Sequence, residues 1–319
     1  MTFMSEESAR EAGEQTRVAF GLALTQLAET DETVFAVSAD TQDLMALRGM
    51  MANHPERVVD AGIAEQNAMG IASGLATAGM RPFLCGYAPF ITARSMEQLR
   101  NDVAYAHQRV VIGAAASGIS LGVSGGTHHA LEDLGLMRAL PNMTAIVPAD
   151  VHQAWNAVMA TEDIDGPVYI RLGGRVPEPT VTEREANFQV GRADRLREGN
   201  DVTIIACGCL VGDALQAAET LAGEGVAARV LNMHTIKPLD RDAVLAAAAE
   251  TKGIVTAEEH RMTGGLGGAV AELLAQESPA PMRMVGMPDE FAVVGPTPKV
   301  REGYGLSAGN IVASCKDLL

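Results

Sequence analysis

The chain has 319 residues, of which 47% are hydrophobic and 20% are charged, a balance typical of a globular protein large enough for two domains. Its formal net charge of -16 excludes the basic surface on which nucleic-acid-binding proteins depend. No apolar run reaches the roughly 18–20 residues that a membrane span needs, and the acidic N-terminus lacks the pattern of a signal peptide. We therefore expect a cytoplasmic protein that binds neither nucleic acid nor membrane.

The first half of the chain alternates between predicted helices and predicted strands. Apolar residues recur at helical spacing in 15–29, 95–108 and 151–163, and residues 58–79 begin extended and turn helical. Short apolar runs typical of buried parallel strands occupy 33–40, 81–90, 109–117, 144–150 and 166–173. This alternation predicts an α/β domain with a mostly parallel sheet, in which ligands bind beyond the carboxyl ends of the strands.

The pattern breaks at residues 176–189, which are rich in Pro, Glu and Thr as a linker would be. A second alternating series follows, with predicted elements at 201–208, 213–225, 226–238, 240–253, 253–260 and 264–278. The predicted fold is therefore α/β with two consecutive domains, residues 1–185 and 186–319. Each is expected to be a mostly parallel sheet flanked by helices.

Glu65 stands at a strand-to-helix junction in GIAEQNAMG, residues 62–70, where an exposed or helix-capping carboxylate is the simpler interpretation. The glycines of 264–269 do not have the G-x-G-x-x-G spacing of a dinucleotide site. The spacing of the four cysteines does not fit a zinc site either, so no metal site is predicted in this chain.

The wider context of Glu65 resembles the transketolase family. Residues 58–104 and 125–150 are similar to the pyrimidine-binding domain of transketolases and deoxyxylulose-phosphate synthases, and 234–238 and 256–274 look like the family's C-terminal domain. The resemblance implies an enzyme that uses thiamine diphosphate to transfer a two-carbon ketol unit from a ketose to an aldose.

The resemblance also implies roles for individual residues. The family's glutamate at the position of Glu65 contacts N1′ of the cofactor's aminopyrimidine and promotes protonation there, so Glu65 is the expected catalytic residue. Tyr87 and Phe90 fall where the family places ring-stacking aromatics, and Asp40 where it places a residue close to the cofactor. His128, in GGTHHALED, matches a histidine that bonds sugar hydroxyls or moves a proton.

Arginines and departures from the family pattern bear on the substrate. Arg17 aligns with a phosphate-binding arginine, and either Arg171 or Arg175 lies near another; a guanidinium suits phosphate because it donates two parallel hydrogen bonds. A family aspartate is replaced by Ser124, and a family histidine by Ala116 or Ser117, which argues against the ordinary pentose phosphates as substrates. A third aromatic position holds Ala93, followed by Arg94.

The diphosphate-binding half of such a site is missing from this sequence. The family holds the diphosphate through Mg²⁺ or Ca²⁺ at a G-D-G motif followed by an Asn, and the sequence contains no G-D-G. We therefore expect a partner, the N-terminal transketolase subunit with G-D-G…N, in an α2β2 assembly. The alternatives are the β subunit of a 2-oxo acid dehydrogenase, which shares both domains and the glutamate, and a catalytically silent scaffold on the same fold.

Overall fold

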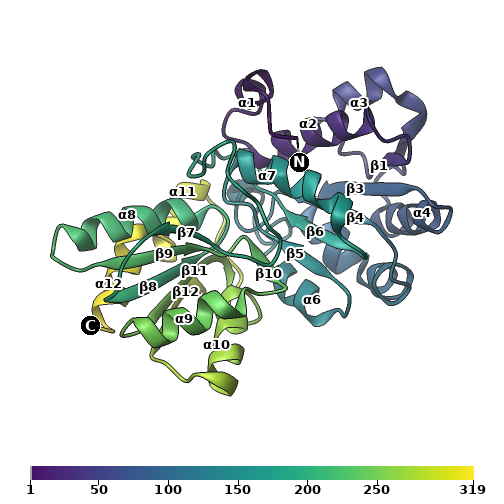
Figure 1. Cartoon of the computed structure of the whole chain (residues 1–319). Coiled ribbons are helices and arrows are strands. Elements are labelled where there is room, and N and C mark those ends of the chain that lie inside the picture. The colour runs from purple at the N-terminus through teal and green to yellow at the C-terminus, as the bar shows by residue number, and fades with distance from the viewer. Residues whose placement is uncertain (1) are drawn as a thin grey trace.

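The structure, a computed structural model, describes residues 2–319 and consists of two α/β domains lying side by side (Figure 1). A seven-stranded sheet in the order β10-β5-β6-β4-β3-β1-β2 forms the N-terminal domain, and a five-stranded sheet in the order β12-β11-β8-β9-β7 forms the C-terminal domain. Neighbouring strands run parallel except for β10 with β5 and β7 with β9. The predicted fold class, two α/β domains with mostly parallel sheets, is confirmed.

The bounds of the elements follow in chain order. The strands are β1 Val34–Ser38, β2 Val58–Asp60, β3 Arg81–Tyr87, β4 Val111–Ala115, β5 Thr144–Ile146, β6 Val168–Arg171, β7 Asp194–Arg197, β8 Val202–Ala206, β9 Ala228–Asn232, β10 Thr235–Lys237, β11 Ile254–Arg261 and β12 Met282–Met287. The α-helices are α1 Glu6–Ala12, α2 Thr16–Ala28, α3 Arg48–Asn53, α4 Glu65–Thr77, α5 Met96–Gln98, α6 Asp133–Ala139, α7 Val151–Ala160, α8 Leu210–Ala222, α9 Arg241–Glu250, α10 Leu266–Glu277, α11 Thr297–Gly303 and α12 Ala308–Lys316. Short 3₁₀ turns lie at Pro55–Arg57, Gly122–Ser124 and Thr161–Asp163, and π-helical segments at Phe90–Arg94 and Leu99–Tyr105. Across residues 2–319, none of the helices combines the length and apolar character of a membrane span.

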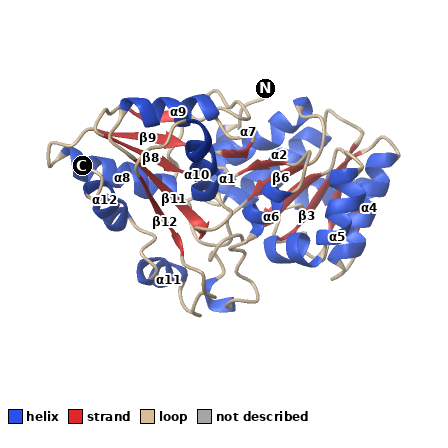
Figure 2. Cartoon of the chain, turned by 90° about the horizontal axis from the view of Figure 1, so that it is seen from below, coloured by secondary structure: helices blue, strands red, loops and turns tan. Residues whose placement is uncertain are grey.

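Two apolar layers cover the faces of the N-terminal sheet, because side chains alternate along each strand. Leu84 and Ile112 pack with residues of α4 and α6, whereas Phe83 and Val111 pack with residues of α2 and α7. The first of these clusters continues into the C-terminal domain, where it takes in α9 and α10. Those two helices lie on one face of the C-terminal sheet and α8 and α12 on the other (Figure 2). A single apolar core therefore crosses from one domain to the other.

The segment 226–238, expected as one strand, is divided between the two sheets. Residues Ala228–Asn232 form β9 in the C-terminal sheet, and Thr235–Lys237 form β10, which pairs antiparallel with β5 at the edge of the N-terminal sheet. The helix expected at 95–108 is present, but most of it, Leu99–Tyr105, has π geometry. The loop between β6 and β7 contains the linker expected at 176–189.

A buried arginine at the end of β6 forms an ion pair within the N-terminal domain and a hydrogen bond to the C-terminal domain. Arg171 donates from Nε to Asp133 Oδ2 at 2.7 Å, and from Nη2 to the carbonyl oxygens of Ala130 at 2.9 Å and of Glu259 at 3.0 Å. Tyr169 adds a hydroxyl hydrogen bond of 2.6 Å to the same carboxylate. Burial acts to raise the pKa of Asp133, but the charges of Arg171 and His260 and the hydrogen bonds from Arg171 and Tyr169 together hold that pKa below its usual range.

We predict that Arg171→Met destabilises the isolated chain by about 3–5 kcal/mol, because it leaves the Asp133 carboxylate buried without its cation. Urea or thermal unfolding measures the effect. Arg48→Met is the matched control, since the Arg48 side chain is 83% exposed and, among residues 2–319, pairs only with the similarly exposed Asp43. Equal midpoints for the two variants would contradict a structural role for Arg171.

Candidate active site

Glu65 is the first residue of α4 and lies in the interior. The chain leaves β2, turns at Gly62 with a φ of 68°, and enters the helix directly at Glu65. The residue is only 4% exposed. The helix dipole favours a carboxylate at this N-terminal position. Arg94 donates from Nη1 to Glu65 Oε2 at 2.7 Å, and among residues 2–319 no donor reaches the second carboxylate oxygen, Oε1. One face of this buried carboxylate is therefore free to meet a ligand.

Three rings lie together at the carboxyl ends of β3 and β4. Tyr87 ends β3, Phe90 opens the π-helical segment that follows, and His128 belongs to the loop after β4. The ring centroid of His128 lies 5.3 Å from that of Phe90 and 6.2 Å from that of Tyr87, while Tyr87 and Phe90 are 6.0 Å apart. All three contacts have the edge-to-face geometry that aromatic pairs prefer.

The loop that carries His128 is held by its own backbone. Gly118 and Ala130 exchange two backbone hydrogen bonds, of 2.9 and 3.0 Å. Arg171 also donates a hydrogen bond to the carbonyl oxygen of Ala130. The His128 ring shares a hydrogen bond of 3.0 Å with the Thr127 hydroxyl through Nδ1. These contacts bring His128 to the aromatic residues of a different segment.

The predicted phosphate arginines occupy two different environments. Arg17, at the start of α2, donates to the carbonyl oxygen of Gly174 at 3.0 Å and also binds Leu44 O and Gln15 Oε1. Burial, and then the charge of Arg175, lower the pKa of Arg17, whereas Tyr87 acts in the opposite direction. The charge of Arg17 is therefore influenced by both Arg175 and Tyr87.

Arg171 lies apart from these two cations. Its side chain is only 6% exposed and is engaged in the ion pair with Asp133, whereas Arg175 is exposed. Of the two arginines between which the sequence could not decide, only Arg175 presents its guanidinium to solvent. Arg171 has the structural role instead.

Two residues just beyond the carboxyl ends of strands adopt an unusual backbone conformation. Asp40 follows β1 with a φ of 58°, and Ala116 follows β4 with the same φ. A non-glycine residue in this left-handed region costs about 1–3 kcal/mol, and such residues concentrate at functional sites. Asp40 is exposed, and its N–H donates to Asp60 Oδ1 at 3.0 Å. Ser117 is buried with its hydroxyl on Leu172 O, whereas Ser124 is exposed.

Arg94 is the site residue that sequence reasoning missed. Its guanidinium carbon lies 4.3 Å from the Phe90 ring centroid while the same group binds Glu65. It stands at the end of the π-helical segment Phe90–Arg94, and such segments are frequent at functional sites. The available signal was the cation that follows Ala93, at a position where the family places an aromatic residue.

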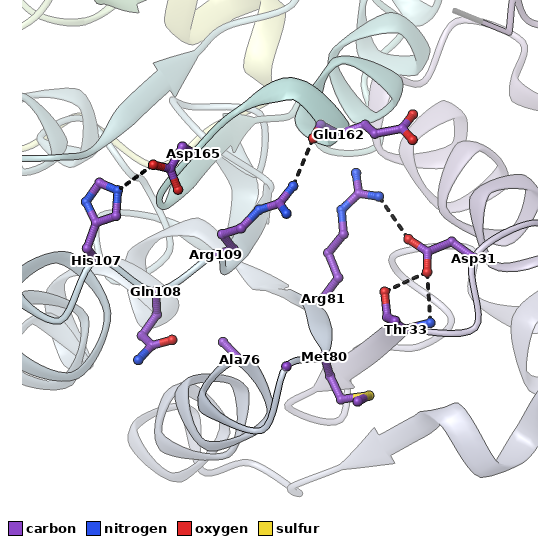
Figure 3. Close-up of a pocket in the computed structure, with 11 residues that line it drawn as sticks. Asp31, Thr33, Ala76, Met80, Arg81, His107, Gln108, Arg109, Glu162 and Asp165 are labelled. Carbon is purple, nitrogen blue, oxygen red and sulfur yellow. Dashed lines mark hydrogen bonds and ion pairs between the residues drawn. The ribbon is translucent and has the colours of Figure 1, made fainter.

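A polar groove of about 530 Å³ lies at the opposite end of the same sheet (Figure 3). It borders the amino ends of β1, β3 and β4. Several of its polar side chains already have partners: Arg81 pairs with Asp31 at 3.1 Å, Arg109 donates to the backbone carbonyl oxygen of Glu162 at 2.9 Å, and His107 lies 3.5 Å from Asp165. Because parallel sheets bind ligands at their carboxyl ends, this groove is not the candidate active site.

Comparisons with known proteins agree with this geometry. Residues 13–175 match the model of the transketolase pyrimidine-binding domain, and residues 191–311 match that of the transketolase C-terminal domain. A 6-deoxy-6-sulfo-D-fructose transketolase subunit from Clostridium sp. is 41% identical over 92% of this chain and 91% of its own length. An apulose-4-phosphate transketolase subunit from Phocaeicola vulgatus is 41% identical over 95% of this chain and 96% of its own length.

A solved structure described as a split gene transketolase, inactive beta4 tetramer, superposes with a TM-score of 0.88. It shares 42% identity and covers 96% of this chain and 98% of its own.

The two sheets, the buried glutamate at a helix N-terminus and the domain matches define a pyrimidine-binding domain followed by a transketolase C-terminal domain. The chain belongs to the transketolase family. Within that family it is the C-terminal subunit of a split transketolase.

Proposed function

We propose that this chain supplies the pyrimidine-binding half of a thiamine-diphosphate site and, with a partner subunit, transfers a two-carbon ketol unit from a ketose to an aldose. The carrying observation is a buried carboxylate with a free oxygen, Glu65, near the Tyr87, Phe90 and His128 rings. An aminopyrimidine needs both features, because its ring is flat and weakly polar while its ring nitrogen must be paired when it is buried. The residues present therefore fit the cofactor.

Each residue of this set has a distinct role in the proposal. The cofactor, when bound, supplies the carbanion chemistry at its thiazolium ring. Glu65 holds a proton at N1′ of the aminopyrimidine and so controls its protonation state. Tyr87 and Phe90 form apolar walls that exclude water and orient the ring, and Asp40 lies near the cofactor at the end of β1. His128 binds a sugar hydroxyl or moves a proton to the substrate.

Two cations support an anionic ketose as the donor. Arg17 interacts electrostatically with both Arg175 and Tyr87, and in a chain of net charge -16 such a pair of cations attracts an anion only locally. Relatives at 41% identity are named for a sulfonated sugar and a sugar phosphate, both of which carry an anionic group. Ser124 stands where the family has an aspartate, and Ala116 or Ser117 where it has a histidine, so we propose a donor other than the ordinary pentose phosphates.

The partner is proposed to be the N-terminal transketolase subunit with a G-D-G…N motif, which holds the diphosphate through Mg²⁺ or Ca²⁺. The sequence of this chain has no G-D-G, and its relatives are named as subunits. An α2β2 assembly provides two such sites about a two-fold axis, the commonest closed symmetry. Those relatives favour this function over the β subunit of a 2-oxo acid dehydrogenase, and the site residues favour it over a silent scaffold.

We expect the purified chain alone to show no transferase activity and only weak binding of thiamine diphosphate. Co-expression with the partner subunit should give activity and a native mass of two chains of each kind. The donor is then identified by screening ketose phosphates, sulfonated ketoses and branched ketoses. Robust turnover by the isolated chain would contradict the proposal, and a fully active 1:1 heterodimer would contradict the α2β2 assembly.

Glu65→Gln should lower kcat of the assembled enzyme by about 10²–10⁴-fold or more, because the amide still hydrogen-bonds N1′ but cannot supply a proton. Cofactor affinity should fall much less, since the diphosphate contacts lie on the partner. Exchange of the cofactor's C2 proton for deuterium in the complex measures the affected step directly. Unchanged exchange in this variant would show that Glu65 is structural.

Arg175→Gln should raise KM for an anionic ketose by about 10–100-fold, the loss of one charge-assisted hydrogen bond. KM for the corresponding uncharged ketose should stay constant, since the lost interaction is with the anionic group. Arg283→Gln on β12, a half-exposed arginine of the C-terminal domain, is the control and should change neither value. Equal effects of Arg175→Gln on charged and uncharged donors would place Arg175 outside the anion site.

A further inference from the structure

Arg94 makes two contacts that the proposed function assigns to the aminopyrimidine of the cofactor. Its flat, cationic guanidinium lies 4.3 Å from the Phe90 ring centroid, and its Nη1 donates to the buried Glu65 carboxylate at 2.7 Å. A planar group with N–H donors that covers an aromatic ring and reaches this carboxylate resembles a protonated aminopyrimidine in shape and charge. We propose that Arg94 occupies the aminopyrimidine position in the cofactor-free subunit and is displaced when the cofactor binds.

The buried carboxylate explains why such a placeholder is needed. The Glu65 side chain is 5% exposed, and a carboxylate withdrawn from water without a partner is strongly unfavourable. In the isolated subunit Arg94 supplies the opposite charge. It thereby stabilises the empty site until a ligand with its own N–H donor takes over the carboxylate.

The surroundings of Arg94 allow it to leave. Its side chain is 47% exposed, and its hydrogen bond to Glu65 is the one it makes among residues 2–319. Long arginine side chains readily hold the charged head in water while the aliphatic part stays on an apolar surface. Displacement therefore breaks one ion pair and the contact with Phe90.

This placeholder competes with the cofactor. When only the fraction of molecules with Arg94 turned away can bind, the apparent dissociation constant rises by the reciprocal of that fraction. Removing the guanidinium removes the competitor, and a charge-assisted hydrogen bond corresponds to about 10–100-fold in affinity. The inference rests on the proposed function, because it takes the Glu65 site to be the aminopyrimidine site.

The test uses 4-amino-2-methylpyrimidine, the ring without the diphosphate, so that the full isolated chain can be titrated without its partner. Calorimetry should show that Arg94→Ala binds this ring about 10-fold or more tightly than the unmodified chain does. The variant should also unfold at a lower temperature, and the ring should restore part of that loss. Arg100→Ala is the matched control, since Arg100 lies on the following π-helical segment, Leu99–Tyr105, and among residues 2–319 its side chain bonds only Asn101.

A second variant and a second ligand keep the test decisive. Arg94→Gln preserves a polar side chain if Arg94→Ala folds poorly, and it should shift affinity in the same direction. In the assembled complex, thiamine diphosphate should bind either variant more tightly than it binds the unmodified enzyme. Equal or weaker binding by both variants, with normal cofactor binding by the unmodified complex, would overturn the placeholder alone. A complex that binds no thiamine diphosphate would overturn the proposed function as well.

Discussion

The buried guanidinium of Arg171 connects the ion pair with Asp133, the active-site loop and the C-terminal sheet. Arg171 ends β6 in the N-terminal sheet, Asp133 begins α6, and the same guanidinium reaches the carbonyl oxygens of Ala130 and of Glu259 on β11. Ala130 lies just beyond His128, so the charge that joins the domains also anchors the loop over the site. A buried guanidinium is tolerated only where its donors are matched in this way.

Parallel strand order explains why distant segments share one site. β3 lies between β1 and β4, and because the three strands run parallel, their carboxyl ends lie at the same end of the sheet. Asp40, Tyr87 and Ala116 are the residues at or just beyond these ends, and Phe90 and His128 follow in the adjoining loops. Asp40 and Ala116 adopt the unfavourable left-handed conformation at the point where the chain turns sharply after a strand.

Within residues 2–319, the charged groups at the carboxyl ends of these strands lack some of the partners that they favour. Glu65 is a buried anion that requires a cation or a donor, and Arg17 and Arg175 are neighbouring cations that favour an anion. In the isolated chain Arg94 supplies the cation that Glu65 requires. The anion that Arg17 and Arg175 favour is left to the substrate. Under the proposed function, assembly with a partner and binding of a cofactor would exchange one set of polar partners for another without requiring a different fold.

Local patterns in the sequence were sufficient for the alternation of strands and helices, the two domains' fold class and the junction that carries Glu65. Apolar periodicity and short motifs are properties of neighbouring residues, and the family resemblance added Tyr87, Phe90 and His128 before their proximity was visible. The tertiary structure alone decided that 226–238 divides between two sheets, that Arg171 points inward while Arg175 faces solvent, and that Arg94 covers Glu65. These outcomes depend on which residues meet across large separations in the chain, and on a π-helical turn that redirects one side chain, and neither is encoded in local periodicity.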